Sequence, residues 1–335
     1  MKTRALAIGL CAAVGLVLVG CSPDEQPSTS TTASNDAATT AAAAQEGSIQ
    51  VENCGQTFTL DSPAQQATLL APNSVTTLSA LGVLDQVVAK AGFYPPEYFD
   101  DATNAKLDGI ETLSDRLDPS GHLQISREQV MATNPDLIIG YTDQITPDTM
   151  KPQGIPVVTE EAYCDGIEGD ATWEDVYHHV ELYAALFGKP EEGAAYIEEL
   201  KKTVASFEGE DSGKTVAVLY PTVGGGVTYA YGTGSMSHPV VTGAGLENVF
   251  ADTSERVFEV SAEQLVDRAP DVIVALYQSD NPDEIIDAVR QLPGSEAIPA
   301  VRDNRIIPLL FNYAEPPTPL AVKGVEVLKN ELAEK

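Results

Sequence analysis

The sequence predicts an α/β protein with two similar lobes, each built on a central, mainly parallel β-sheet, and one long helix between them. The strongest evidence is an internal repeat: ISREQVMATNPDLIIGY at 125–141 returns 135 positions later as VSAEQLVDRAPDVIVAL at 260–276, with six identical residues. A strand–helix–strand succession precedes the first copy, and residues 190–207 have the pattern of one uninterrupted helix between the copies. We therefore expect lobes at 49–188 and 209–335, joined by a helix at 189–208.

The first 20 residues have the features of a secretory signal peptide. Lys2 and Arg4 precede an apolar run that is too short to span a bilayer comfortably and that ends in small residues. Its last residues, Leu-Val-Gly-Cys, resemble a bacterial lipobox, so we expect Cys21 to be acylated and to become the mature amino terminus. A secreted protein with a chance cysteine at this position is the alternative.

Residues 21–48 are predicted to form a disordered tether between the lipid anchor and the lobes. After Cys21 the segment contains no Val, Ile, Leu, Met or aromatic residue, so it cannot bury enough apolar surface to offset the entropy of ordering. As a flexible coil it would reach roughly 30 Å.

The folded surface is predicted to be strongly acidic. The formal charge of −31 becomes −33 once Lys2 and Arg4 leave with the signal peptide, which contains no acid. Nucleic acid and anionic lipid headgroups are therefore poor partners, but the charge says little about a small ligand in a cleft.

Cys54 and Cys164 are the two thiols that remain once Cys11 leaves with the signal peptide and Cys21 carries lipid. In an exported protein such a pair usually forms a disulfide, which here would tie the first strand to the loop after residues 157–158. Two free buried thiols are the alternative.

The elements of the first lobe follow from alternation, periodicity and helix breakers. Residues 48–60 alternate apolar and polar side chains around an Asn-Cys-Gly turn, which predicts a hairpin. Strands near 67–71 and 87–91, with a helix near 74–81 between them, form a βαβ unit. A helix over 172–187 closes the lobe.

Each copy of the repeat predicts a capped helix that leads into a buried strand. Ser126 and Ser261 are each followed three positions later by glutamine, which is a capping box, and a Pro-Asp pair ends each helix before an apolar run. Glu128 and Glu263 then lie in the exposed first turns of these helices.

The helix at 190–207 begins with a proline and two acidic residues, after Gly188, and has lysines near its end. Three- and four-residue steps predict that its buried face consists of Ala194, Ile197, Leu200, Val204 and Phe207. In the second lobe, the same criteria predict strands at 214–220 and 305–310 and helices at 236–243, 282–292 and 320–332.

Several further segments stand in a characteristic order around the repeat: NSVTTLSALGVLDQVVAKAG at 73–92, TGAGLENVFAD at 242–252 and VRDNRIIPL at 301–309. Together with the repeat they resemble the helix-linked (class III) solute-binding proteins of ABC importers, which deliver ferric siderophores, haem and vitamin B12. The resemblance covers the chain from Cys54 onward and implies two Rossmann-like lobes of the chelatase-like type. The Asn-Cys-Gly opening resembles actinobacterial members that bind iron complexes.

The resemblance implies a binding protein with no enzymatic activity and no cofactor. It would be a lipid-anchored monomer on the extracytoplasmic face of the cell membrane, with the importer's permease and, through it, the ATPase as partners. Its ligand would be a small-molecule metal chelate: a ferric siderophore is expected first, with haem and cobalamin as the alternatives.

In the resembling family each lobe presents a glutamate to an arginine of the membrane subunits, and the matching residues are Glu128 and Glu263. The alternative for each is that an acid in a first turn merely complements the helix dipole, worth about 0.3–1 kcal/mol. Thr76 stands where the family more often has a glutamate, which leaves the role of its helix open.

Ligands of open α/β sheets bind beyond the carboxyl ends of the strands, so the loops there hold the candidate ligand residues. Arginines suit the anionic oxygens of an iron chelate, and aromatic faces suit the rings of a siderophore or a macrocycle. His122 falls where vitamin B12-binding relatives place a cleft-lining aromatic residue. A solvated loop side chain is the alternative for each candidate. The candidates are Tyr94, Arg116, His122, Tyr229, Tyr231, Arg256, Phe258, Tyr277 and Tyr313.

Two other classes of site are disfavoured. The four histidines, His122, His178, His179 and His238, are too few and too scattered for a direct metal-ion site, so none is expected. A lipid-anchored hydrolase is the alternative from another class, but no Gly-x-Ser-x-Gly motif occurs, and Ser235, Ser237 and His238 lie too close in sequence to suggest a triad. The glycine-rich stretches at 224–226 and 232–234 lack the features of phosphate-binding loops and are expected to be turns.

Overall fold

The computed structural model describes residues 48–118, 121–164, 167, 169–207 and 211–334. The predicted signal peptide, the lipidation site Cys21 and the tether up to residue 47 lie outside the described residues. Ala44–Lys335 form one compact unit, to which the following description applies. In the described part of the chain, no helix combines the length and the apolar character that a bilayer span needs.

The first sheet is formed by strands that precede α6 (Pro190–Ala205) in the sequence. All its strands are parallel, in the order β5-β4-β3-β6-β7, and its central strands are fully buried and apolar, as expected of a sheet covered on both faces. The strands and helices that were predicted here with bounds are confirmed to within two residues at each end. The helix of the first repeat copy ends at Met131, before the predicted stop at Pro135, and α2, α4, β5 and β7 are additional elements. The bounds are β3 Ala67–Leu69, α1 Val75–Ala80, β4 Val87–Ala91, α2 Asp101–Asp108, β5 Glu111–Ser114, α3 Arg127–Met131, β6 Leu137–Ile139, α4 Pro147–Met150, β7 Val157–Val158 and α5 Trp173–Leu186.

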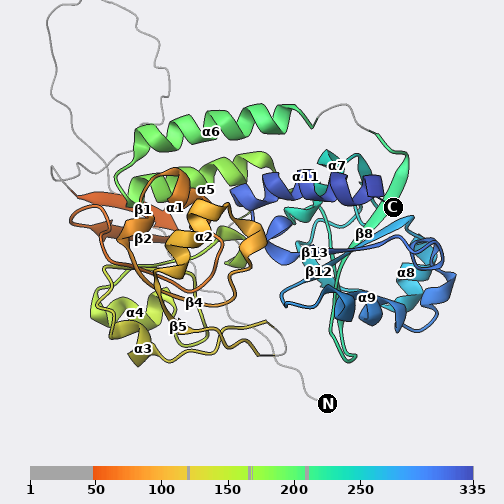
Figure 1. The fold of residues 1–335 in the computed structure, drawn as a ribbon, viewed down its shortest axis with the longest axis horizontal. Helices are drawn as coiled ribbons and strands as arrows, with labels where there is room; N and C mark the ends of the chain where they lie inside the picture. Colours follow the sequence, from red (N-terminus) through yellow and green to blue (C-terminus); the bar gives the residue numbers. More distant parts are fainter. Residues whose placement is uncertain (1–47, 119–120, 165–166, 168, 208–210, 335) are drawn as a thin grey trace, which may run out of the picture. The chain divides into compact units, whose positions relative to one another are not determined.

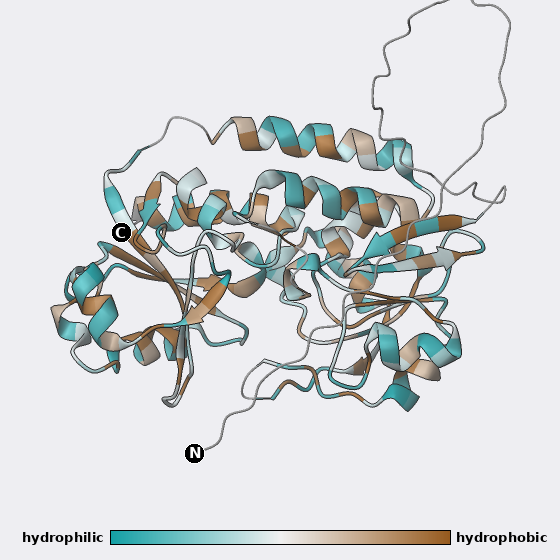
Figure 2. Ribbon diagram, turned by 180° about the vertical axis from the view of Figure 1, so that it is seen from behind, coloured by the Kyte–Doolittle hydropathy of each residue, from teal (hydrophilic) through white to brown (hydrophobic). Residues whose placement is uncertain are grey.

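The second sheet is formed by strands that follow α6. Its order is β11-β9-β8-β12-β13, with β10 also paired to β8. Only β9 pairs antiparallel with its neighbours, β8 and β11, so the sheet is mainly parallel as predicted. Figure 1 shows the two sheets with their helices, and Figure 2 shows that the strands are largely hydrophobic. The bounds are β8 Lys214–Pro221, β9 Thr228–Tyr231, α7 Ser237–Gly243, β10 Leu246–Asn248, β11 Val257–Glu259, α8 Ala262–Arg268, β12 Val272–Tyr277, α9 Pro282–Arg290, α10 Pro299–Arg302, β13 Ile306–Leu310 and α11 Pro319–Glu334.

A hairpin of β1 (Ile49–Asn53) and β2 (Gln56–Leu60) opens the described chain, as predicted. Its turn places Cys54 and Gly55 at positive φ, +53° and +68°, the backbone of a tight two-residue turn. The Asn53 amide exchanges two hydrogen bonds with the backbone of Thr159, at 2.9 and 3.0 Å. A disulfide joins Cys54 to Cys164, so the predicted pairing is confirmed and the hairpin is fixed to the loop after β7.

The helix α6 packs along α5 (Figure 1). Most of its predicted apolar face is at least partly buried. Ile197 and Leu200 are buried as predicted, but Ala194 is exposed, so its placement was wrong. Gly193 occupies the interface instead. A Cβ atom there would lie 2.5 Å from the Cβ of Ala184 in α5, so only glycine allows the two helices to approach this closely.

The lobes also meet in a second place, a joint formed by Asn73 and Tyr98 of the first lobe and Asn312, Tyr313 and Lys323 of the second. The Asn312 backbone N–H donates to the Tyr98 hydroxyl at 2.9 Å, and its side-chain Nδ2 donates to Asn73 Oδ1 at 2.7 Å. The rings of Tyr98 and Tyr313 pack edge to face at 5.0 Å, and one hydrophobic core continues from lobe to lobe. The linking helix is therefore not the sole connection.

Candidate functional site: the cleft between the lobes

A cleft of about 1140 Å³ separates the lobes and is lined by the loops that follow the strands of both sheets. Its wall is rich in aromatic rings and side-chain amides, which offer apolar faces beside neutral donors and acceptors. The aromatic lining residues are Phe93, Tyr141, Tyr163, Tyr220, Tyr229, Tyr231, Tyr277 and Phe311, and the amides are Asn73, Gln124, Gln129, Gln144, Gln278 and Asn312.

The cleft carries an apolar rim, which consists of Tyr141, Val223, Val227 and Tyr229. Among the described residues these are the large hydrophobic side chains with the greatest exposure, at 44%, 52%, 39% and 37%. All four line the cleft. Exposed apolar groups that gather at one concave site have the character of a ligand-binding surface.

Six of the nine predicted ligand residues line the cleft: Arg116, His122, Tyr229, Tyr231, Arg256 and Tyr277. The other three lie elsewhere. The Tyr94 hydroxyl is buried, and this burial raises the pKa of the phenol. The ring of Phe258 packs edge to face on Phe250 at 5.3 Å, and Tyr313 lies in the joint, where its hydroxyl donates to the Glu97 carbonyl.

Five cleft aromatics were missed by the sequence analysis: Phe93, Tyr141, Tyr163, Tyr220 and Phe311. Tyr220 lies near the carboxyl end of β8 and Phe311 directly follows β13, so the rule that ligands bind beyond strand ends could have found both. Their rings pack edge to face at 5.8 Å. Tyr163 is placed in the cleft by the loop that the adjacent Cys164 ties to the hairpin.

Arg256 is held in the cleft wall by a fully buried carboxylate, Glu315. Arg256 Nη1 donates to Glu315 Oε2 at 2.8 Å, and the other oxygen, Oε1, accepts from the Ser235 hydroxyl and from the Met236 N–H at 2.9 Å. The guanidinium also lies over the Tyr163 ring, 5.5 Å from its centre. Because every one of these polar partners donates to Glu315, they stabilise the ionised carboxylate.

The two pKa values reflect this pairing. Burial raises the pKa of the Glu315 carboxyl, and the Arg256 charge and the donated hydrogen bonds oppose the shift only in part. Burial also opposes the charge of Arg256, but the charge and hydrogen bond of Glu315, together with the nearby Tyr163 and Tyr231, outweigh it and hold the pKa of the guanidinium above its usual value. Glu315 thus fixes the orientation of Arg256 and keeps it charged.

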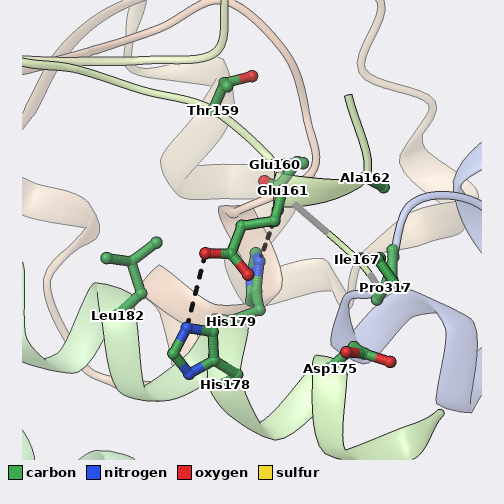
Figure 3. A pocket seen from close by; sticks show the side chains of 10 residues that line it. All are labelled: Thr159, Glu160, Glu161, Ala162, Ile167, Asp175, His178, His179, Leu182 and Pro317. Atoms are coloured by element: carbon green, nitrogen blue, oxygen red, sulfur yellow. Dashed lines mark hydrogen bonds and ion pairs between the residues drawn. The ribbon is translucent and has the colours of Figure 1, made fainter. Parts of the chain in front are cut away.

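A second, much smaller pocket of about 20 Å³ lies beside α5 (Figure 3). The buried His179 contacts Glu160 Oε2 through Nδ1 at 2.8 Å and Thr77 Oγ1 through Nε2 at 3.0 Å. The half-exposed His178 faces Glu161 instead, at 3.6 Å, so the two histidines point in different directions. This volume is close to that of one water molecule, which leaves the large cleft as the candidate site.

Comparison with known proteins identifies the family of this chain. The family described as periplasmic binding protein matches residues 69–313. The chain belongs to this periplasmic binding protein family. A solved structure described as an ABC-type Fe3+-hydroxamate transport system from Saccharomonospora viridis is 44% identical, with a TM-score of 0.79, over 85% of this chain and 98% of that one. The vitamin B12-binding protein of Salmonella typhimurium is 24% identical over 279 residues, 81% of this chain and 91% of the relative. A periplasmic haem-binding protein from Roseiflexus shares the fold at 17% identity, with a TM-score of 0.61 over 81% of this chain and 98% of that one.

Membership of the periplasmic binding protein family confirms the predicted architecture, that of a helix-linked solute-binding protein of ABC importers. Proteins of this family bind transported substrates and are not enzymes. The hydrolase alternative therefore gains no support. In the described part of the chain, no three His, Cys, Asp or Glu side chains gather in a group that could hold a metal ion.

The two predicted docking glutamates of this periplasmic binding protein occupy equivalent places. Ser126 and Ser261 form the predicted capping boxes of α3 and α8, and Glu128 and Glu263 lie exposed in the first turns. Neither glutamate forms an ion pair with another described residue. Both carboxylates are free to meet a cationic partner, one from each lobe.

Proposed function

We propose that this protein captures a ferric hydroxamate siderophore outside the cell membrane and delivers it to the permease of an ABC importer. The observation that carries the proposal is the cleft, whose aromatic and amide wall and apolar rim suit a large, mostly neutral organic ligand. Its volume of about 1140 Å³ lies slightly above the roughly 300–1,000 Å³ typical of small-molecule sites, which suits a large ligand. The 44% identical relative from Saccharomonospora viridis, described as an Fe3+-hydroxamate transport system, supports the same ligand class.

Thermal unfolding with a panel of chelates tests this function. Protein lacking its first 21 residues is heated alone and with a ferric trihydroxamate, haem or cobalamin, each at a large excess. Because a ligand at about 100 times its Kd stabilises by about 2.7 kcal/mol, the true ligand should raise the Tm by at least about 5 °C. The trihydroxamate is expected to do so, whereas a larger shift with haem or cobalamin would reassign the ligand.

A matched pair of variants ties the binding to the cleft. Tyr229→Ala removes a ring from the apolar rim. It should lower the affinity for the trihydroxamate by about tenfold, because one aromatic contact of this kind contributes roughly 1–3 kcal/mol to binding. Tyr94→Phe, outside the cleft lining, should leave the affinity unchanged. Equal effects of both replacements would argue against binding in the cleft.

Anchoring of the protein by lipid at Cys21 is the second part of the proposal. It is supported by the Leu-Val-Gly-Cys sequence at the end of the apolar run and by the polar tether that follows. In a bacterial host, the full chain should incorporate labelled fatty acid and sediment with membranes. Cys21→Ala should abolish the labelling, and a labelled Cys21→Ala protein would exclude this site.

Docking of the permease through Glu128 and Glu263 is the third part. Charge reversal of both glutamates to lysine should stop uptake while leaving ligand affinity unchanged, because neither residue lines the cleft. Asp148 in the capped helix α4 and Asp267 in α8 are exposed acids on comparable helices, so their reversal is the matched control. Intact uptake by the Glu128 and Glu263 variant would disprove the docking role.

A further inference from the structure

The charges of the cleft determine which iron chelates it can accept. The described lining residues include two arginines, Arg116 and Arg256, against three carboxylates, Asp118, Asp143 and Glu284. His122 is the other titratable basic residue in the lining, and its ring contacts Asp118 at 3.4 Å. The formal charge of the wall is therefore about neutral to slightly negative, on a chain of net charge −31.

Arg256 adds less positive potential than its own charge suggests. Its guanidinium donates at 2.8 Å to Glu315, whose side chain has 0% exposure, whereas that of Arg256 has 28%. Seen from a ligand several ångströms away, the two opposite charges largely cancel, and water screens this buried pair poorly. The remaining N–H groups of the guanidinium can still donate to neutral oxygen acceptors, since the contact with Glu315 uses only Nη1.

We propose that the ion pair of Arg256 and Glu315 makes the cleft selective for iron chelates without net negative charge. The inference rests on the proposed function and specifies its substrate class. Each hydroxamate loses one proton on binding iron, so three of them balance the charge of Fe³⁺ and give a neutral complex. Each catecholate loses two, so a ferric tris-catecholate carries three negative charges, and a cleft that is neutral or negative repels it.

Glu315→Gln tests the selectivity because it keeps the shape of the side chain and removes the compensating charge. Binding of a neutral ferric trihydroxamate and of a ferric tris-catecholate is measured by calorimetry. The wild-type protein should bind the neutral complex at least about 100-fold more tightly. Glu315→Gln should strengthen tris-catecholate binding by about tenfold or more, and should change trihydroxamate binding less than about threefold.

Two further measurements keep the test decisive if Glu315→Gln folds poorly. Glu284→Gln also removes one carboxylate from the cleft but leaves the Arg256 pair intact, so it should strengthen tris-catecholate binding by less than about tenfold. In the wild-type protein, added salt should strengthen tris-catecholate binding because it screens repulsion, whereas an uncompensated Arg256 would give the opposite salt dependence.

The outcomes separate the inference from the proposed function. Equal wild-type affinity for both complexes, or a Glu315→Gln variant with an unchanged affinity ratio, would overturn the charge selectivity while leaving siderophore binding in place. Failure of the wild-type protein to bind either ferric complex would overturn both.

Discussion

Replacement of Tyr98 by phenylalanine should measure how strongly the joint holds the two lobes together. Tyr98 is 2% exposed, and its hydroxyl accepts the backbone N–H of Asn312, which is itself 4% exposed. Tyr98→Phe keeps the ring and its packing on Tyr313 but leaves this buried N–H without its partner. An unsatisfied buried donor costs about 1–3 kcal/mol, so the free energy of unfolding should fall by that amount.

Tyr313→Phe is the matched control for this prediction. The Tyr313 hydroxyl donates to the Glu97 carbonyl, which also accepts a hydrogen bond from Lys323 Nζ at 2.8 Å. The carbonyl therefore keeps a partner, and the loss should stay below about 1 kcal/mol. Urea unfolding monitored by circular dichroism gives both values. A loss below about 0.5 kcal/mol for Tyr98→Phe, or separate transitions for the two lobes in the wild-type protein, would refute the coupling that we infer.

Four other predictions concern the disulfide, His238, His178 and the response to ligand. Reduction of the Cys54–Cys164 disulfide, or replacement of both cysteines by serine, should lower the free energy of unfolding by about 2–4 kcal/mol, and unchanged urea midpoints would contradict this. Burial lowers the pKa of His238 below 6.5. Its contribution to stability is therefore complete above pH 6.5 and is lost as the pH falls through the lowered pKa. In His238→Gln, Tm should fall less steeply as the pH is lowered. A hydrogen bond to Glu161 raises the pKa of His178. The contribution of this half-exposed side chain to stability is small and is lost as the pH rises, so His178→Gln should flatten this fall of Tm with rising pH. Ligand addition should change the radius of gyration in small-angle scattering only slightly, whereas a large compaction would show a flexible hinge.

The sequence was most informative where a local pattern determines a local structure. The capping boxes at Ser126 and Ser261 are formed as predicted, because serine and glutamine three positions apart satisfy each other's backbone without help from the rest of the fold. The periodicity of apolar residues was less informative than the capping boxes. It placed Ala194 on the buried face of α6, but Gly193 lies there, since the close approach of α5 depends on the neighbouring helix and not on the spacing within α6.

The site was harder to predict because its contacts join distant segments. The rule that ligands bind beyond strand ends identified the correct loops. It could not predict which way a side chain in a loop points, and Tyr94 and Phe258 point into the protein and not into the cleft. Nothing local links Arg256 to Glu315, which lies 59 positions away, or Tyr98 to Asn312, 214 positions away. Such pairs become visible only in the folded structure.

The joint and the charge of the cleft are connected through a single residue. The Glu315 carboxylate holds Arg256, and its backbone carbonyl accepts a hydrogen bond from Asn312 Nδ2 at 3.1 Å, the same group that donates to Asn73 of the first lobe. A lobe rotation large enough to reshape the cleft would break the buried contacts of Asn312 with Asn73 and Tyr98, which cross between the lobes, and leave their polar groups unpaired, at about 1–3 kcal/mol each. The shape of the cleft therefore changes little when a ligand binds. Because the cleft cannot adjust to each chelate, the Arg256 charge, which Glu315 balances, lets it discriminate between chelates by their net charge.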